Sequence, residues 1–319
     1  MGQMCGASHG DAFDARCDGG QSAELGLAWS SARMQGWREY MEDRHFAMSS
    51  LPSDAWKGHT VFGVLDGHGG AQVAEFCNSR LTSAIAEGTP SDMSDALVNA
   101  FHKMDELLLS ERSWSSTSAQ VRGGCAAVVC VVSQSSISVA HAGDCRAVLC
   151  RSGTTVPLTE DHKPGLPRER KRILAAGGYL TTGSNGDLRV CADLNLSRAI
   201  GDLRFKSNSS LMPSEQIICS TPDVMSIPRT PQDEFIILAC DGVWDVITNE
   251  DAVKFVRPRL HQCPAGNIQR MQSIMSELVH SCVSPNLSET AGLGGDNLTA
   301  MLINLQVNDD ARAASREED

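Results

Sequence analysis

The chain has 319 residues, and 39 Asp and Glu against 27 Lys and Arg give it a net charge of −12. It has no basic stripe to follow a nucleic-acid backbone, no apolar run of membrane-spanning length and no signal peptide in residues 1–20. Because 41% of the residues are hydrophobic, we expect a globular protein with a large core. We expect it in the cytoplasm, with the nucleus as an alternative location.

The two ends of the chain differ in composition from the part between them. Residues 1–23 are small, polar and Gly-rich and predict a disordered leader, and residues 307–319 predict an acidic, disordered tail. Gly2 is a candidate for myristoylation and Cys5 for a second acyl chain, which would bring the protein to a membrane. Gly6 stands where that motif has Ser or Thr, so an unmodified tail stays open. Residues 24–306 predict one folded domain, with a monomer as the default.

Apolar periodicity predicts the elements between these ends. In chain order they are a strand at 60–65, helices at 73–85 and 93–108, strands at 125–132, 137–142 and 146–151, a basic helix at 167–176, a strand at 234–240, a helix at 268–282 and a strand at 298–305. Tight connections between 125 and 151 favour an antiparallel meander over repeating βαβ units. The predicted class is α+β, a central sandwich of two antiparallel sheets flanked by helices.

The 12 cysteines include no C-x-x-C pair. Cys125, Cys130, Cys150 and Cys240 lie inside apolar runs, which predicts buried, reduced thiols in a reducing compartment.

Three aspartates stand at the ends or starts of predicted strands. VFGVLDGHGG runs into Asp66, FIILACDGVWDV runs into Asp241, and Asp296 directly precedes a strand in GGDNLTAMLINL. A strand end holds a side chain rigidly, and a following glycine lets the backbone turn and approach a ligand. Each Asp-Gly alone is also a common turn. Three such carboxylates converging from distant segments would repel each other unless a cation lay among them.

The segment MQGWREYMEDRH adds Arg38, Glu42 and Asp43. Arg38 and Glu42 have i, i+4 spacing, so a surface ion pair is one interpretation. The other is a phosphate-binding guanidinium beside further metal-ligating oxygens.

These segments resemble the metal-dependent type 2C protein phosphatases of the PPM family. The matching motifs are GWREYMED, VFGVLDGHGG, HAGDCRAVL, LTEDHKP, ERKRILAAGG, LSRAIGD, ILACDGVWDV and GGDNLT. They occur in the family's order and cover residues 24–306, which would therefore be a phosphatase catalytic domain. The resemblance also implies the two-sheet sandwich.

The resemblance assigns roles residue by residue. Asp66 would bridge two metal ions, with the Gly67 carbonyl on one of them. Glu42 and Asp43 would lie near that ion, and Asp241 and Asp296 would hold the second ion. Asp144 would hold a third and weaker ion, shared with Asp241. Arg38 would bind the phosphate, His68 would be the general acid, and Asp245 and Asn297 would be supporting residues.

The implied reaction is hydrolysis of phosphoserine and phosphothreonine in phosphorylated proteins by a water activated between Mg²⁺ or Mn²⁺ ions, with no phosphoenzyme. Oxygen ligands favour these cations, whereas zinc would need His and Cys clusters. Two alternatives stay open: a pseudophosphatase that only binds phosphoproteins, and a phosphatase of small phosphate esters.

Other features of the sequence have a structural interpretation beside a functional one. Cys145 and Arg151 have the C-x5-R spacing of cysteine-dependent phosphatases, but the residues between them predict a strand, not a phosphate-binding loop. His162 is either catalytic or a locally bonded loop histidine, and the basic residues of 167–176 are either substrate contacts or a solvated face. Packing is the expected role of Trp37 and Trp244. Cys125 stands where many family members have Thr.

Overall fold

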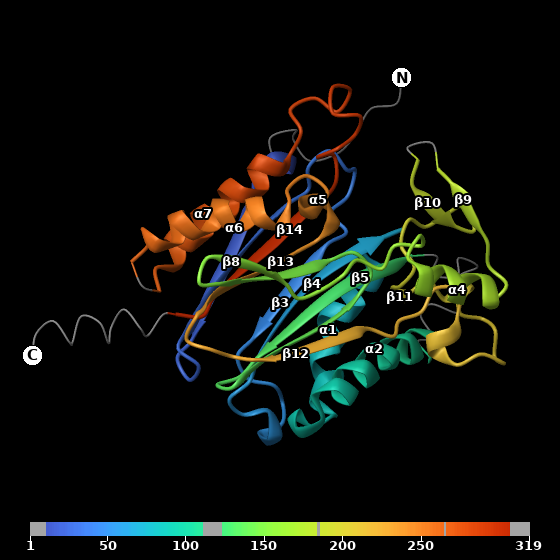
Figure 1. The fold of residues 1–319 in the computed structure, drawn as a ribbon, viewed down its shortest axis with the longest axis horizontal. Helices are drawn as coiled ribbons and strands as arrows, with labels where there is room; N and C mark the ends of the chain where they lie inside the picture. Colours follow the sequence, from blue (N-terminus) through green and yellow to red (C-terminus); the bar gives the residue numbers. More distant parts are fainter. Residues whose placement is uncertain (1–10, 111–122, 184–185, 265, 307–319) are drawn as a thin grey trace, which may run out of the picture. The chain divides into compact units, whose positions relative to one another are not determined.

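The computed structural model describes residues 11–110, 123–183, 186–264 and 266–306, which form two compact units. The first unit comprises residues 11–43, Val148–Val156 and 231–306, and the second comprises Arg44–Ala147 and Pro157–Thr230. Each unit is built around one large sheet (Figure 1). The predicted α+β class, with two large antiparallel sheets and helices, is confirmed.

The first unit's sheet has the strand order β1-β2-β14-β13-β7-β8. In it β1 and β2, β2 and β14, and β14 and β13 pair antiparallel. Its elements are β1 (Arg16–Ser22), β2 (Leu27–Met34), β7 (Arg146–Arg151), β8 (Thr154–Pro157), β13 (Asp233–Ala239), β14 (Leu298–Asn304), α5 (Asp241–Trp244), α6 (Asn249–His261) and α7 (Ile268–Cys282). Helices α6 and α7 lie along this sheet (Figure 1), and α7 buries a stripe that includes Met271, Ile274 and Leu278.

The second unit's sheet has the order β12-β6-β5-β4-β3, with β11 also paired to β5. Its elements are β3 (Arg44–Met48), β4 (Thr60–His68), β5 (Gly124–Val132), β6 (Ser136–Ala142), β11 (Ile200–Gly201), β12 (Asp223–Pro228), the hairpin β9 (Leu180–Thr182) and β10 (Leu188–Val190), α1 (Gln72–Ala86), α2 (Met93–Ser110) and α4 (Pro167–Ala175). The predicted helices at 73–85, 93–108, 167–176 and 268–282 are all confirmed within a few residues.

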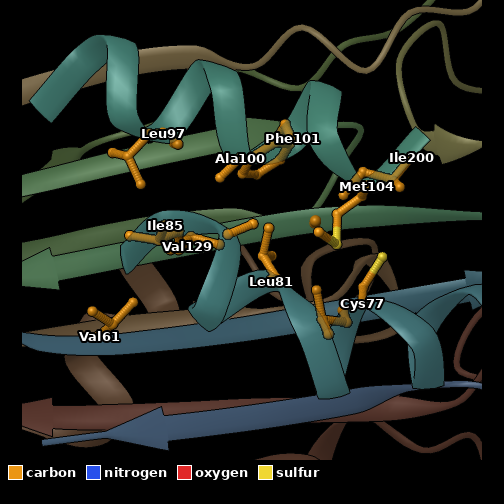
Figure 2. Packing of buried hydrophobic residues seen from close by; sticks show 14 of the residues in the cluster. Val61, Cys77, Leu81, Ile85, Leu97, Ala100, Phe101, Met104, Val129 and Ile200 are labelled. Carbon is orange, nitrogen blue, oxygen red and sulfur yellow. The ribbon is translucent and has the colours of Figure 1, made fainter. Parts of the chain in front are cut away.

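Figure 2 shows how α1 and α2 cover one face of the second sheet. Leu81 and Ile85 of α1 and Phe101 of α2 point into a shared apolar layer above Val61 and Val129 of the strands. All five side chains are fully buried. Burial of each contributes about 1.5–3 kcal/mol, so this layer fixes β4, the strand that ends in Asp66 and His68.

The predicted meander over 125–151 is correct for β5 and β6 but wrong for β7, which joins the other sheet. Gly143, with a φ of +111°, turns the chain between β6 and β7. His162 donates its backbone N–H to the Gly143 carbonyl at 3.0 Å, and the Gly143 N–H donates to His162 Nδ1 at 3.1 Å. These bonds occupy Gly143's backbone groups, and β12 takes the place beside β6 instead.

The predicted disordered leader also differs from the structure, because Arg16–Ser22 form the edge strand β1. Asp18, Gly19 and Gly20 have low strand propensity, but they lie in register with Ser31, Ser30 and Trp29 of β2, and the Asp18 carboxylate accepts the Gly19 N–H at 2.8 Å. The leader's Gly2 and Cys5 and the predicted tail at 307–319 lie outside the described residues.

The cysteines and helices bear on two further expectations. The described cysteines are all free thiols, and Cys125, Cys130, Cys150 and Cys240 are fully buried, as predicted. Among the helices of the described ranges, none is both long enough and apolar enough to cross a bilayer.

A buried ion-pair network connects α4 to the loops that follow it. Glu169 is fully buried, and Arg198 donates to it from Nη2 at 2.6 Å while Arg172 pairs with its other oxygen. Arg198 also donates to Asp223 at 2.8 Å. The predicted solvated face therefore holds for Arg170 and Lys171, which are exposed, and is wrong for Arg172, which is mostly buried.

The electrostatics of this network explain why Glu169 stays ionised. Burial alone would raise the pKa of Glu169, but hydrogen bonds and positive charge from Arg198 and Arg172 outweigh it and lower the pKa to about 2. Nearby, burial lowers the pKa of His162 to about 4, and its ring stacks on His141 with centroids 4.4 Å apart. His162 is thus a locally bonded loop histidine.

We predict that Glu169→Gln lowers the free energy of unfolding by about 3 kcal/mol near neutral pH, because it leaves Arg198 buried without its counter-charge. A carboxyl whose folded pKa is depressed stabilises the fold fully above its ordinary pKa of 4.5 and loses that stabilisation as pH falls through about 2. The difference between wild type and variant should therefore shrink from about pH 5 to about pH 2 in denaturant titrations. Glu106→Gln, on the exposed side of α2, should differ from wild type by about 0.5 kcal/mol or less. A difference for Glu169→Gln that does not depend on pH would contradict the assignment.

Candidate functional site

The first unit gathers acidic side chains around the start of β14. Asp43 is buried, and the hydroxyl of Thr299 donates to its Oδ2 at 2.7 Å. Burial raises the pKa of Asp43 to about 6, with the carboxylates of Asp296 and Glu42 acting in the same direction against hydrogen bonds from Thr299 and Cys240. Three predicted ligands of this unit therefore lie close enough for their charges to act on one another.

Asn297 ties the loop of Arg38 and Glu42 to β14. Its Nδ2 donates to the carbonyls of Gln35 at 2.7 Å and Tyr40 at 3.0 Å, and its Oδ1 accepts the backbone N–H of Glu42 at 2.8 Å. These bonds hold a loop more than 250 residues away in sequence, because each satisfies a backbone group that the loop cannot pair internally. Asn297 was predicted only as a supporting residue.

Arg38 lies at the exposed edge of this cluster. Its Nη2 donates to Asp296 Oδ2 at 2.5 Å, with 60% of the arginine side chain exposed. The structure thus pairs Arg38 with Asp296, a partner that the i, i+4 spacing does not indicate. A solvent-exposed guanidinium is a group that can bind an incoming anion.

Asp241 begins α5 directly after β13, and Gly242 brings it against the Asp296–Asn297 turn. A Cβ on Gly242 would lie 2.0 Å from the Asn297 carbonyl oxygen and 3.2 Å from the Cβ of Asp296. Only a glycine permits this approach. Asp245 is exposed, and its backbone N–H donates to the Asp241 carbonyl at 2.8 Å.

The two tryptophans beside these residues pack, as predicted. Trp244 is buried and donates to the Ala239 carbonyl at 2.9 Å. Trp37 is 42% exposed, donates to the Ser284 carbonyl at 2.8 Å and stacks edge-on against Phe13.

The second unit carries the other predicted site residues. Asp66, Gly67 and His68 form the end of β4, where they pair with Ala126, Cys125 and Gly124 of β5. Cys125, in the place of the family's Thr, is buried in the apolar core, and burial raises the pKa of its thiol well above the usual range.

Asp144 lies in the turn after β6 and is buried. Lys163 donates to its Oδ2 at 2.5 Å, so this carboxylate already has a counter-charge. The residues that follow Cys145 form strand β7 (Arg146–Arg151), as predicted, and not a phosphate-binding loop.

The chemistry of the donor set fits hard divalent cations. In the first unit the grouped side chains are the carboxylates of Glu42, Asp43 and Asp296, which are oxygen ligands. The Cys240 thiol near Asp43 is engaged by backbone groups, since it accepts the Thr299 N–H at 3.1 Å.

Sequence reasoning missed three residues that hold these groups. Thr299 holds Asp43, Lys163 holds Asp144, and Asp202 contacts His68. Each lies inside a motif that the sequence shows, in GGDNLT, LTEDHKP and LSRAIGD, so a polar residue in such a motif was the available signal.

Comparison with known proteins agrees with this geometry. A family model described as protein phosphatase 2C matches residues 27–291. Probable protein phosphatase 2C 3 of Paramecium tetraurelia is 36% identical over 290 residues, which cover 88% of this chain and 93% of the relative. Probable protein phosphatase 2C 42 of Oryza sativa subsp. japonica is 35% identical over 323 residues, with coverage of 91% and 88%.

A solved structure supports the fold alone. The crystal structure of a phosphatase from a pathogenic strain of Toxoplasma gondii has a TM-score of 0.74 and 20% identity, and covers 91% of this chain and 95% of its own.

These matches define the class of protein first: it is an enzyme, a metal-dependent protein phosphatase. Within that class, the chain belongs to the protein phosphatase 2C family. The family resemblance read from the eight motifs is thereby confirmed.

We predict that Gly242→Ala lowers the free energy of unfolding by about 1–3 kcal/mol, because its methyl group would force the Asn297 carbonyl away. The displaced Asp296–Asn297 turn should also weaken the response of the melting temperature to added Mn²⁺. Gly165→Ala is the matched control, since its Cβ meets only Leu188 at 3.3 Å. Equal melting temperatures and equal Mn²⁺ responses in the two variants would contradict the role given to Gly242.

Proposed function

We propose that this chain hydrolyses phosphoserine and phosphothreonine in proteins by direct attack of water, at a site for two divalent cations, Mg²⁺ or Mn²⁺. The observation that carries the proposal is the buried Asp43 beside Asp296 and Glu42, a concentration of negative charge that a cation would relieve. The exposed Arg38 at its edge supports an anionic substrate.

Individual roles are part of the proposal. On the roles that the resemblance implies, Asp66 would serve both ions. The Gly67 carbonyl, Glu42 and Asp43 would serve the first ion, and Asp241 and Asp296 would hold the second. The adjacency of Gly242 to the Asp296–Asn297 turn supports pairing the last two. Asp144 would hold a third ion weakly, since Lys163 would have to give up its 2.5 Å contact. Asp245 and Asn297 would support the site.

Bound divalent cations would supply positive charge and lower the pKa of a water ligand. The chain's own residues would do the rest. Arg38 would exchange its bond to Asp296 for the phosphoryl oxygens and balance charge as it spreads over them. His68 would protonate the leaving oxygen. The bond from phosphorus to the serine or threonine oxygen breaks, and that oxygen takes the bonding electrons and a proton from His68. The attacking water forms the new bond to phosphorus, and one of its protons restores His68.

We predict that phosphate release from a phosphothreonine peptide needs Mn²⁺ or Mg²⁺, stops in EDTA and falls by at least about 100-fold in Asp241→Asn. Asp54→Asn, an exposed aspartate outside the site, is the matched control and should keep wild-type activity. Phosphate release is measured directly. Activity that survives both EDTA and Asp241→Asn would overturn the site assignment.

Two other outcomes separate the alternatives. Phosphopeptide binding without turnover under any of these cations would identify a binding module. Higher kcat/KM for small phosphate esters than for phosphopeptides would identify a phosphatase of small phosphate esters instead of a protein phosphatase.

A further inference from the structure

His68 has a buried carboxylate as its partner. The ring Nε2 lies 2.6 Å from Asp202 Oδ2, with 26% of the histidine side chain exposed and none of the aspartate side chain. A short contact between an imidazole N–H and a fully buried carboxylate fixes both the ring's orientation and which nitrogen carries the proton.

The backbone holds Asp202 in an unfavourable conformation to make this contact. Its φ is +47° and its ψ is 38°, the left-handed region, which is uncommon for residues with a side chain. Its N–H donates to the Gly123 carbonyl at 3.0 Å, and the preceding Gly201 N–H donates to Asp105 Oδ1 at 2.8 Å. Lys206 anchors Asp105 at 2.6 Å. Strain of this kind persists where surrounding bonds determine the conformation.

The neighbouring strand leaves room for the pair. Gly124 pairs with His68 on one side and with Gly201 on the other. A Cβ on Gly124 would lie 2.1 Å from Asp202 Oδ2 and 2.6 Å from His68 Nε2. No residue with a side chain could stand there while the contact is kept.

The second carboxylate oxygen, Asp202 Oδ1, is buried with no hydrogen-bond partner among the described residues. Burying such a group costs stability, so packing alone does not account for an aspartate at this position. Its Oδ2 serves His68, which points to a functional reason.

We propose that Asp202 is a positioning residue that holds His68 through Nε2–H and so makes Nδ1 the nitrogen that gives its proton to the leaving oxygen. This inference rests on the proposed role of His68 as general acid. Asp202 itself touches no reacting atom, and no bond in the reaction forms or breaks at its carboxylate.

The test compares two phosphate esters in Mn²⁺. A phosphothreonine peptide has a poor leaving group that needs a proton, whereas p-nitrophenyl phosphate has a good one that needs it little. We expect Asp202→Asn to lower kcat on the peptide by about 10- to 100-fold and to leave kcat on p-nitrophenyl phosphate within about threefold. His68→Gln should show the same selectivity, and Asp202→Asn in the His68→Gln background should add little.

Asp233→Asn is the matched control. Asp233 is also a fully buried aspartate, and Arg151 donates to it at 2.6 Å. Its loss should lower stability while leaving the ratio of the two kcat values unchanged. Equal losses on both esters in Asp202→Asn would mean a merely structural role and would overturn the proposal.

A second readout does not depend on turnover. In metal-free protein, the Nε2–H proton of the His68 ring should give the downfield NMR signal typical of a short hydrogen bond to a carboxylate, and Asp202→Asn should shift that signal upfield. An unchanged signal in that variant would overturn the proposal.

The two proposals fail in different ways. If His68→Gln lowers kcat on the two esters equally, the general-acid role itself is wrong. If His68→Gln lowers kcat mainly on the peptide but Asp202→Asn does not, only the positioning role is wrong.

Discussion

Negative charge held at the ends of rigid strands is the constraint on which this structure depends. Asp43 is buried next to Glu42 and Asp296, and burial together with their charges makes its carboxylate harder to ionise. The Thr299 hydroxyl holds the Asp43 carboxylate in place, and the Asn297 backbone N–H holds that of Asp296. Such repulsion lowers stability unless a cation offsets it, which is why we interpret the arrangement as functional.

The same constraint explains residues whose identity would otherwise be arbitrary. Gly242 lacks a side chain because the Asn297 carbonyl occupies the space, and Asn297 is an amide because it both donates and accepts across the Arg38 loop. In the other unit, Gly124 makes room for the His68–Asp202 contact. In each unit, close backbone approach lets side chains from distant segments keep fixed positions.

The sequence predicted the elements whose burial is one-sided or continuous. The predicted bounds of the core strands and of the helices with clear apolar stripes, such as α2 and α7, lie within a few residues of the observed ones. The apolar period of these elements is set by the layer that they cover. Strand β2 was missed, since the fully buried Ser30 and Ser31 interrupt its apolar pattern. The path of β7 could not be predicted either, because one of its neighbours in the sheet, β13, lies far along the chain.

For the candidate site, the motifs identified the aspartates and His68 but not the residues that hold them. Asp202 follows Gly201 in LSRAIGD, yet no local pattern says that its carboxylate reaches a histidine 134 residues away. The burial of Arg172 was likewise hidden, since Arg170 and Lys171 on the same helix face solvent. Pairing across long sequence separations is a tertiary property that periodicity does not encode.

The most direct test of the account is a calorimetric titration of Mn²⁺ into metal-free wild type and into Asp296→Ala. We expect saturable binding of about two ions per chain in the wild type and the loss of at least one of them in the variant. Absence of binding in the wild type, or an unchanged stoichiometry and affinity in Asp296→Ala, would contradict the claim that these strand-end carboxylates form a metal site.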